Sequence, residues 1–236
     1  LQYAILHSTG GSTGEPFKFY IDRKTISIAN AARWRGWGYA GHKFGDRMAV
    51  LGGLSLVPDR QGLLRMSIRK VIDRTIDLPA INIRREILEA YARKIMEYKP
   101  KFILAYPSSL YFLSNLLREQ KICKIRPKAA LTTAEMLFPF QRELIEDTLG
   151  CPIFDCYGAF DGGTAAFECE EHYGYHMAIE KTVMEFVDED GNPVAEGEDG
   201  RIIATDLFNY TMPFIRYDTG DMGVYSCEQC SCKRKL

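Results

Sequence analysis

The sequence lacks the features that mark membrane, secreted or nucleic-acid-binding proteins. No hydrophobic run is long enough to span a bilayer, and the observed start does not have the pattern of a signal peptide. The 30 basic and 31 acidic residues leave a formal charge of −1, which predicts no general attraction to nucleic acid or acidic membranes. We therefore expect a chain that binds neither.

A disulfide framework of the secreted type is also missing. The seven cysteines are an odd number and are mostly scattered along the chain. This pattern favours a reducing, cytoplasmic environment. The 236 residues are enough for one large domain or two small ones, and the 46% of hydrophobic residues supply a substantial core.

What is present is an alternation of helical and strand patterns. The helical patterns, with apolar residues three or four apart, occupy residues 24–39, 84–98, 108–120 and 138–149. Short apolar runs that predict strands lie at residues 47–51, 102–106, 129–132 and 153–157. Repeated strand–helix–strand order predicts an α/β fold, with a parallel-rich sheet and flanking helices.

After about Gly174 the pattern changes to short strands separated by turns, at residues 176–179, 183–187, 201–205 and 214–217. We expect residues 1–174 to form an α/β nucleotide-binding subdomain and residues 175–236 a small, mainly β subdomain. Neither end has the pattern of a capped terminus, so we also expect the chain to be part of a longer protein.

The segment Thr9–Pro16 combines three glycines with three hydroxyl side chains. This composition favours a loop whose backbone N–H groups surround an anion such as a nucleotide phosphate, although a plain turn has a similar composition. Glu15, not lysine, follows Gly14, which excludes the loop of the P-loop NTPases. The alternation of Phe17, Phe19 and Ile21 predicts a strand directly after the loop.

Two other segments follow predicted strands, where open parallel sheets bind ligands. One is residues 132–135, and the other runs from Tyr157 to Asp161. The ring of Tyr157 suits a flat ligand such as adenine, and the carboxylate of Asp161 suits a hard cation such as Mg²⁺. A core tyrosine with a solvated aspartate is the simpler alternative.

A fourth segment, residues 209–221, predicts a strand that runs into a turn built by Asp218, Thr219, Gly220 and Asp221. Such a turn places Asp221 as an acceptor for the hydroxyls of a ribose, or it is a loop without a ligand.

Together these segments resemble the adenylate-forming enzymes, in the branch of phenylacetate–coenzyme A ligase, coenzyme F390 synthetase and the capsule-biosynthesis proteins. The resemblance covers nearly the whole chain, in the family's order. It rests on Thr-Gly-Gly-Ser-Thr-Gly-Glu-Pro at 9–16, Thr-Ala-Glu at 133–135, Tyr-Gly-x-x-Asp at 157–161, Glu-Cys at 168–169 and Met-Pro-Phe-Ile-Arg-Tyr-Asp-Thr-Gly-Asp at 212–221.

The resemblance implies a role for each motif. The loop residues that would bind the ATP phosphates are Thr9, Gly11, Ser12, Thr13 and Gly14. In the rest of the ATP site, adenine would be bordered by Ala134 and Glu135 and stacked on Tyr157 next to Gly158, and the ribose would be held by Asp221. Thr13 and Asp161 would be the catalytic contacts, but Asp161 stands where the family usually has a longer glutamate for Mg²⁺.

The chemistry implied is a two-step activation of a small-molecule carboxylic acid. The acid attacks the α-phosphorus of ATP, giving an acyl-adenylate and pyrophosphate, and a thiol, usually coenzyme A, then displaces AMP. The family often dimerises, and its mobile C-terminal domain carries a lysine that adenylation needs. Without that domain we expect the chain alone to be inactive. A non-thiol acceptor, or a nucleotide-binding protein without catalysis, are the alternatives.

Four residues predict a structural zinc site, namely Cys169, His176, Cys230 and Cys232. Cys227 could replace Cys232, since it gives the commoner C-x₂-C spacing with Cys230, and His172 could replace His176. Reduced cysteines without a metal are the alternative.

Overall fold

The computed structural model describes residues 4–8, 17–53, 56, 74–81 and 83–234. The chain divides into two compact units. The central unit is Trp37–Cys156, and the terminal unit joins Leu1–Gly36 to Tyr157–Leu236. The residues of the Thr9–Pro16 loop that were predicted to bind phosphate lie outside the described residues.

The central unit is built on parallel strands. Its strands are β3 (Met48–Gly52), β4 (Thr75–Pro79), β5 (Phe102–Ala105), β6 (Ala129–Thr133) and β7 (Ile153–Gly158), the last two residues of which belong to the terminal unit. Neighbouring strands pair in parallel in the order β4-β3-β5-β6-β7, and the sheet order continues through β8 and β9. Every residue of β3 and β5 is buried, as expected for parallel strands covered on both faces.

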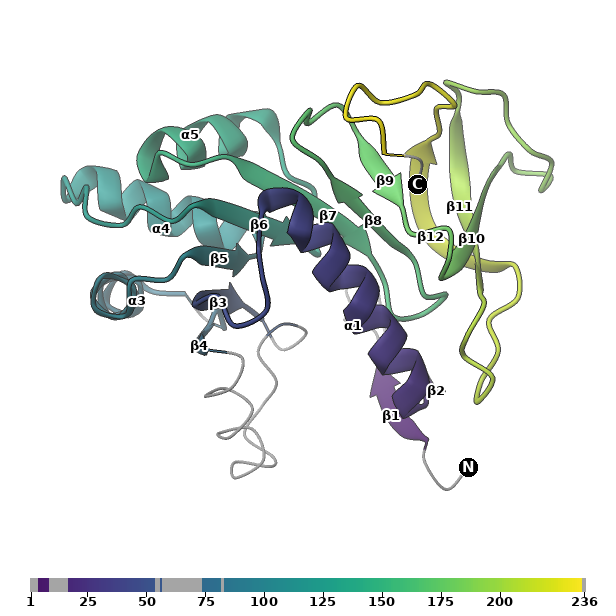
Figure 1. The fold of residues 1–236 in the computed structure, drawn as a ribbon, viewed down its shortest axis with the longest axis horizontal. Coiled ribbons are helices and arrows are strands. Elements are labelled where there is room, and N and C mark those ends of the chain that lie inside the picture. The colour runs from purple at the N-terminus through teal and green to yellow at the C-terminus, as the bar shows by residue number, and fades with distance from the viewer. Residues whose placement is uncertain (1–3, 9–16, 54–55, 57–73, 82, 235–236) are drawn as a thin grey trace. The chain divides into compact units, whose positions relative to one another are not determined.

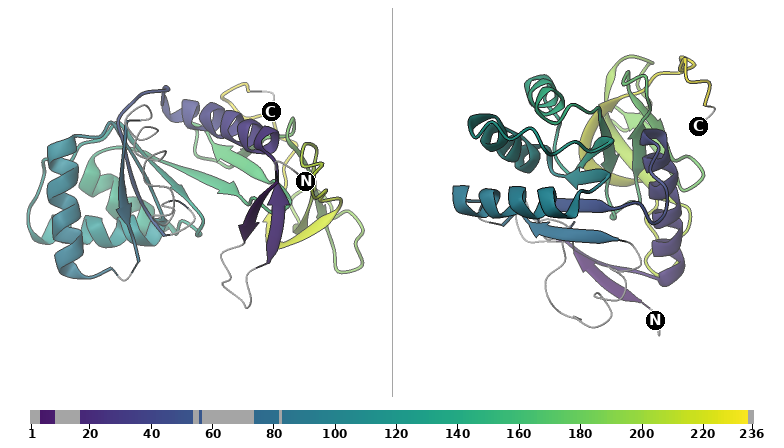
Figure 2. Two further views of the ribbon diagram at one scale, coloured as in Figure 1. Left: turned by 90° about the horizontal axis from the view of Figure 1, so that it is seen from below. Right: turned by 60° about the vertical axis from the view of Figure 1, so that its left-hand side comes forward.

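Three helices pack on one face of these strands, as Figures 1 and 2 show. They are α3 (Arg85–Tyr98), α4 (Pro107–Glu119) and α5 (Pro139–Leu149). Their apolar stripes meet alternate residues of β3 and β5, including Leu51 and Ile103, in one core. Proline at the first position starts α4 and α5, and Gly150, with φ 63°, ends α5. The 3₁₀ helix η1 (Gly38–Ala40) precedes β3.

The terminal unit is mainly antiparallel. The hairpin of β1 (Ile5–Ser8) and β2 (Lys18–Ile21) precedes helix α1 (Arg23–Trp37). Strands β8 (Ala165–Glu168) and β9 (Tyr175–Met177) pair with each other. A separate sheet has the order β10-β11-β12, formed by β10 (Thr182–Val187), β11 (Asp199–Asp206) and β12 (Tyr217–Val224).

These elements confirm the predicted α/β class, with a large mostly parallel sheet, flanking helices and antiparallel strands towards the C-terminus. The strand predicted at 214–217 was wrong, because β12 begins at Tyr217 and runs through the residues expected to form a turn. The subdomain limits at residues 174 and 175 stay a prediction. In the described part of the chain, no helix is both long and apolar enough to cross a membrane.

Candidate nucleotide site and metal centre

The predicted phosphate loop connects the two strands of the β1–β2 hairpin. The paired residues Ser8 and Lys18 flank it, one on each side. On the β1 side, the ring of His7 lies 5.3 Å from that of Phe160, and on the β2 side Phe17 stacks on Tyr217 at 6.3 Å. Both flanks of the loop therefore contact residues next to, or paired with, Asp161.

The base of this hairpin is fixed by a small aromatic core. Phe19 is fully buried, and its ring meets that of Phe214 edge to face at 5.6 Å. Phe214 in turn lies 5.0 Å from Tyr217. The Met-Pro-Phe-Ile-Arg-Tyr segment thus packs against the strand that leaves the predicted phosphate loop.

Two tyrosines hold the two predicted ligand-binding carboxylates. The hydroxyl of Tyr157 donates to Asp221 Oδ2 at 2.8 Å, and that of Tyr217 donates to Asp161 Oδ2 at 3.0 Å. Burial and the neighbouring carboxylate raise the pKa of each tyrosine to about 12, so both remain protonated donors at neutral pH. The structure therefore brings Tyr157 and Asp221 together, although they are 64 residues apart.

Sequence reasoning missed Tyr217. It lies inside a quoted motif, but its pairing with Asp161 joins residues 56 positions apart, and no local pattern signals that contact. The hydroxyl holds one carboxylate oxygen of Asp161 and so restrains that side chain.

The turn-forming residues before Asp221 make a bulge inside β12. The backbone N–H of Gly220 donates to Asp218 Oδ1, and the hydroxyl of Thr219 donates to the carbonyl of Ile202 at 2.9 Å. Gly220 has φ 77°, and the β11–β12 register shifts between Arg201 and Ile203. The predicted turn chemistry is present, but it bends a strand and does not end one.

A buried lysine, Lys181, contacts the loop that follows Asp161. Gly162 and Gly163 have φ values of 72° and 69°, and a Cβ on Gly163 would clash with Asp206 Oδ2. Lys181 Nζ donates to the carbonyl of Gly163 and lies 3.9 Å from Asp206 Oδ2. Burial lowers the pKa of Lys181, and the Asp206 carboxylate opposes that shift.

The predicted adenine-pocket residues of the central unit follow β6, as expected. Ala134 has φ 71°, a left-handed conformation that is costly for a residue with a Cβ. Glu135 Oε2 accepts the backbone N–H of Ser108 at 3.0 Å, and so caps the first turn of α4. This contact gives Glu135 a structural role, and its role towards adenine stays a prediction.

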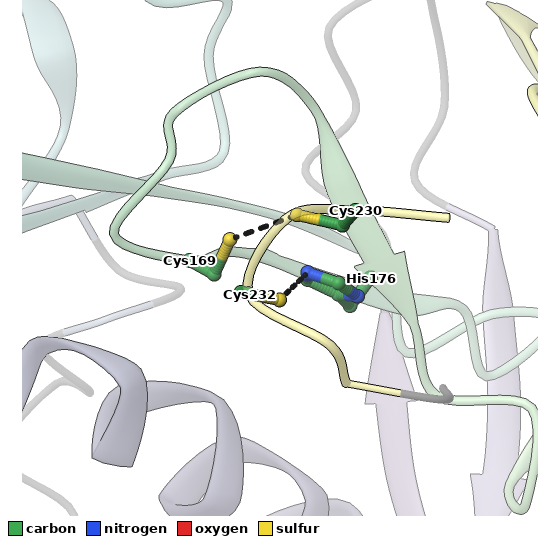
Figure 3. Close-up of side chains that lie close together, drawn as sticks. All are labelled: Cys169, His176, Cys230 and Cys232. Carbon is green, nitrogen blue, oxygen red and sulfur yellow. Dashed lines mark hydrogen bonds between the residues drawn. The ribbon is translucent and has the colours of Figure 1, made fainter. Parts of the chain in front are cut away.

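The four predicted metal ligands lie together in the terminal unit (Figure 3). Their ligand atoms are all within 4.8 Å of one another. Cys169 Sγ lies 3.7 Å from Cys230 Sγ, and Cys232 Sγ lies 3.3 Å from His176 Nε2. Tetrahedral zinc with Zn–S bonds of about 2.3 Å separates its sulfurs by about 3.8 Å, so the spacing suits that ion.

The two alternative ligands have other contacts. His172 Nδ1 lies 3.2 Å from Glu168 Oε2, and Cys227 is exposed with its N–H bonded to Glu196. All seven cysteines are free thiols. Among the described residues, the group that could hold a metal is the four first predicted, which come from residues 230–232, β9 and the loop after β8.

Comparison with known proteins finds relatives that align with nearly the whole chain. No protein-family model matches the chain. The phenylacetate–coenzyme A ligase of Thermus thermophilus is 25% identical over 239 residues, which cover 99% of this chain and 52% of that protein. That of Escherichia coli is 28% identical over 231 residues, covering 94% and 51%. The chain thus spans about half the length of these curated relatives.

Solved structures share the fold. An open conformation of 2-hydroxyisobutyryl-CoA ligase in complex with 2-HIB-AMP and CoA matches with a TM-score of 0.76 and 22% identity, over 98% of this chain and 51% of that one. The anthranilate CoA ligase AuaEII in complex with anthranoyl-AMP matches with a TM-score of 0.65 and 16% identity, over 89% and 40%. The chain therefore has the core fold of the adenylate-forming enzymes, and the resemblance to the phenylacetate–coenzyme A ligase branch predicted from its motifs is confirmed.

Proposed function

We propose that the protein carrying this chain activates a small carboxylic acid with ATP and transfers the acyl group to coenzyme A. The acid would attack the α-phosphorus to give an acyl-adenylate and pyrophosphate, and the thiol of coenzyme A would then displace AMP. The observation that carries the proposal is the pair of tyrosine–carboxylate contacts at Asp221 and Asp161, beside the flanks of the phosphate loop.

The donor set suits Mg²⁺ and ATP. Asp161 is half-buried, and Tyr217 contacts only its Oδ2, so Oδ1 would serve as the hard oxygen ligand that Mg²⁺ prefers. Asp221 is exposed and accepts one hydrogen bond at Oδ2, and a carboxylate has further lone pairs for ribose hydroxyls. Mg²⁺ would neutralise phosphate charge, while the Thr9–Pro16 loop would orient the phosphates.

We further propose that Cys169, His176, Cys230 and Cys232 bind a structural zinc ion. The supporting observation is their mutual spacing of no more than 4.8 Å from three separate segments. Four protein ligands leave no open position, which is typical of structural and not catalytic zinc. Zinc near one equivalent is expected in purified protein, and Cys230→Ser should lower it, while Cys123→Ser at an exposed thiol should not. Protein without zinc would overturn this proposal.

A cytoplasmic location fits the free thiols, and a homodimer fits the family; both remain proposals. The molecular mass in solution tests the dimer.

Pyrophosphate release from Mg·ATP tests the activity, using the longest natural form of the protein that carries this chain. Aryl, fatty and amino acids are each supplied with and without coenzyme A. Acid-dependent release with AMP formation coupled to coenzyme A consumption is the expected result. Release without coenzyme A consumption would point to another acceptor, and no release with measurable ATP binding would contradict catalysis.

A matched pair of variants connects the activity to the site. Asp221→Asn removes the charge that would bind the ribose, and a hydrogen bond to a charged group contributes about 1.5–3 kcal/mol. We expect the KM for ATP to rise about tenfold or more. Asp190→Asn, in an exposed turn of the same unit, should leave the KM unchanged.

A further inference from the structure

A basic hollow of about 480 Å³ lies in the central unit, at the C-terminal end of α3 and before β5 and β6. Five of its ten lining residues are cationic, namely Lys99, Lys101, Lys124, Arg126 and Lys128. The others include buried apolar side chains such as Ile95 and Ile125, and no acidic residue lines it. This is a concentration of positive charge in a chain whose formal charge is −1.

The backbone holds the cations in place. Lys99 forms the left-handed C-cap of α3, with its N–H bonded to the carbonyl of Ile95. Lys101 and Lys128 stand directly before the neighbouring strands β5 and β6, and the N–H of Lys128 donates to the carbonyl of Lys101 at 2.7 Å. Two segments that are distant in sequence therefore place basic residues along the same hollow. At its border, Arg126 Nη1 donates to the carbonyl of Thr148 at 3.3 Å, and Lys128 Nζ lies beside Gly41.

Most of this charge is not compensated. Lys101 Nζ forms an ion pair with Asp46 at 2.8 Å. Across the described ranges, no ion pair joins the other four cations to an acid, so five cations less one paired carboxylate leave four positive charges. The negative end of the α3 dipole amounts to only about half a charge, and Arg47 already donates to the carbonyl of Tyr98 there. Like charges around one hollow repel one another, and an anion would relieve that repulsion.

We propose that this hollow binds a small molecule that carries two or more phosphate groups. Lysine ammonium and arginine guanidinium groups are the usual ligands for phosphate oxygens. The volume falls within the range of about 300–1,000 Å³ typical of small-molecule sites. The apolar floor would accept the body of a nucleotide, and the basic rim its phosphates.

This hollow is separate from the predicted adenine-binding residues of the central unit. The hollow borders the residues that enter β5 and β6, whereas Ala134 and Glu135 follow the opposite end of β6. The two ends of β6 are four residue steps of about 3.3 Å apart, which is too far for one phosphate to contact both. The inference therefore does not rest on the proposed function.

The test is titration of tripolyphosphate, and separately of ADP, into the full-length protein at low salt. The Lys124→Glu/Arg126→Glu variant should bind tripolyphosphate at least about tenfold more weakly. Arg93→Glu/Lys94→Glu is the matched control, since it makes the same charge change on exposed positions of α3 outside the hollow. It should change the affinity by less than about twofold.

Acetylation of Lys99, Lys101 and Lys128, followed by mass spectrometry, locates the ligand. Bound tripolyphosphate should protect all three. A parallel loss of ADP binding would identify a nucleotide as the ligand, and an unchanged ADP affinity would identify an inorganic polyphosphate. If charge reversal disturbs folding, Lys124→Ala/Arg126→Ala should still weaken binding at least about threefold.

Three results would overturn the proposal. They are no tripolyphosphate binding at about 10 mM, an equal loss in the α3 control, and loss of binding in Asp221→Asn, which would place the anion at the other site.

Discussion

Lys181 and Asp206 form a buried ion pair whose disruption has a calculable cost. Their side chains are only 5% and 1% exposed, and they lie 3.9 Å apart. Lys181→Met would remove the ammonium, leave Asp206 Oδ2 without a compensating charge, and remove one donor to the carbonyl of Gly163. Removing one partner of a buried pair typically costs about 3–5 kcal/mol.

We expect a value near the lower end, about 3 kcal/mol, because Asp206 Oδ1 still accepts the N–H groups of Phe208 and Asn209. In a domain of this size each kcal/mol lowers the melting temperature by about 2–4 °C, so the expected fall is about 6–12 °C. Urea unfolding of the wild type and the variant measures the same quantity directly.

The double variant Lys181→Met/Asp206→Asn is the control, since it removes both charges. It should recover at least half of the lost stability, because replacing both partners of a buried pair is often nearly neutral. A Lys181→Met variant within about 1 kcal/mol of the wild type, or a double variant no more stable than the single one, would refute the role of this pair.

Three further outcomes follow from named contacts. Tyr217→Phe removes the hydroxyl that holds Asp161, so the Mg²⁺ concentration for half-maximal adenylation should rise about three- to tenfold; Tyr225→Phe, whose hydroxyl bonds Val194, should not raise it. The pKa of Tyr157 is raised to about 12 from its ordinary value of 10.0. The contribution of protonated Tyr157 to the free energy of unfolding is therefore complete below pH 10 and is lost as the pH rises to 12. Urea unfolding over this pH range should show the loss, and the loss should be smaller in Tyr157→Phe. Glu135→Gln weakens the cap on α4, and should cost about 0.5–1.5 kcal/mol of unfolding free energy; an unchanged value would mean that Ser108 is satisfied otherwise.

Most of the central unit was predictable because its signals are local, although no element was predicted at β4. The buried strands β3 and β5 are continuous apolar runs, and α3 and α4 have regular apolar faces. Their observed limits lie within one or two residues of the predicted ones. Proline and glycine at the helix ends explain this accuracy, because each acts on the backbone at its own position.

The terminal unit was harder to predict for a physical reason. Its important contacts join distant segments, such as Tyr217 with Asp161 and Lys181 with Gly163. Turn-forming residues around Gly220 predicted a turn, but pairing with β11 draws them into a strand as a bulge. The same residues suit both a free turn and a bulge within a strand, and only pairing with β11 decides which one forms.

The metal group lies between these extremes. Residue types indicated cysteine and histidine ligands, with His176 as the first choice and His172 as its alternative. The choice depends on β9, which places His176 opposite Phe167 of β8, while His172 stays beside Glu168. The sequence therefore indicated which types of residue would be ligands, but not how they are arranged in space.

The most direct test of the account is acid-dependent exchange of labelled pyrophosphate into ATP, which reports acyl-adenylate formation without any acceptor. With the full-length protein, exchange should require both Mg²⁺ and a carboxylic acid, and should proceed without coenzyme A. Asp221→Asn should reduce it about tenfold or more at limiting ATP, and Asp190→Asn should not. Absence of exchange with every acid tested, or exchange unchanged by Asp221→Asn, would contradict the proposed chemistry at this site.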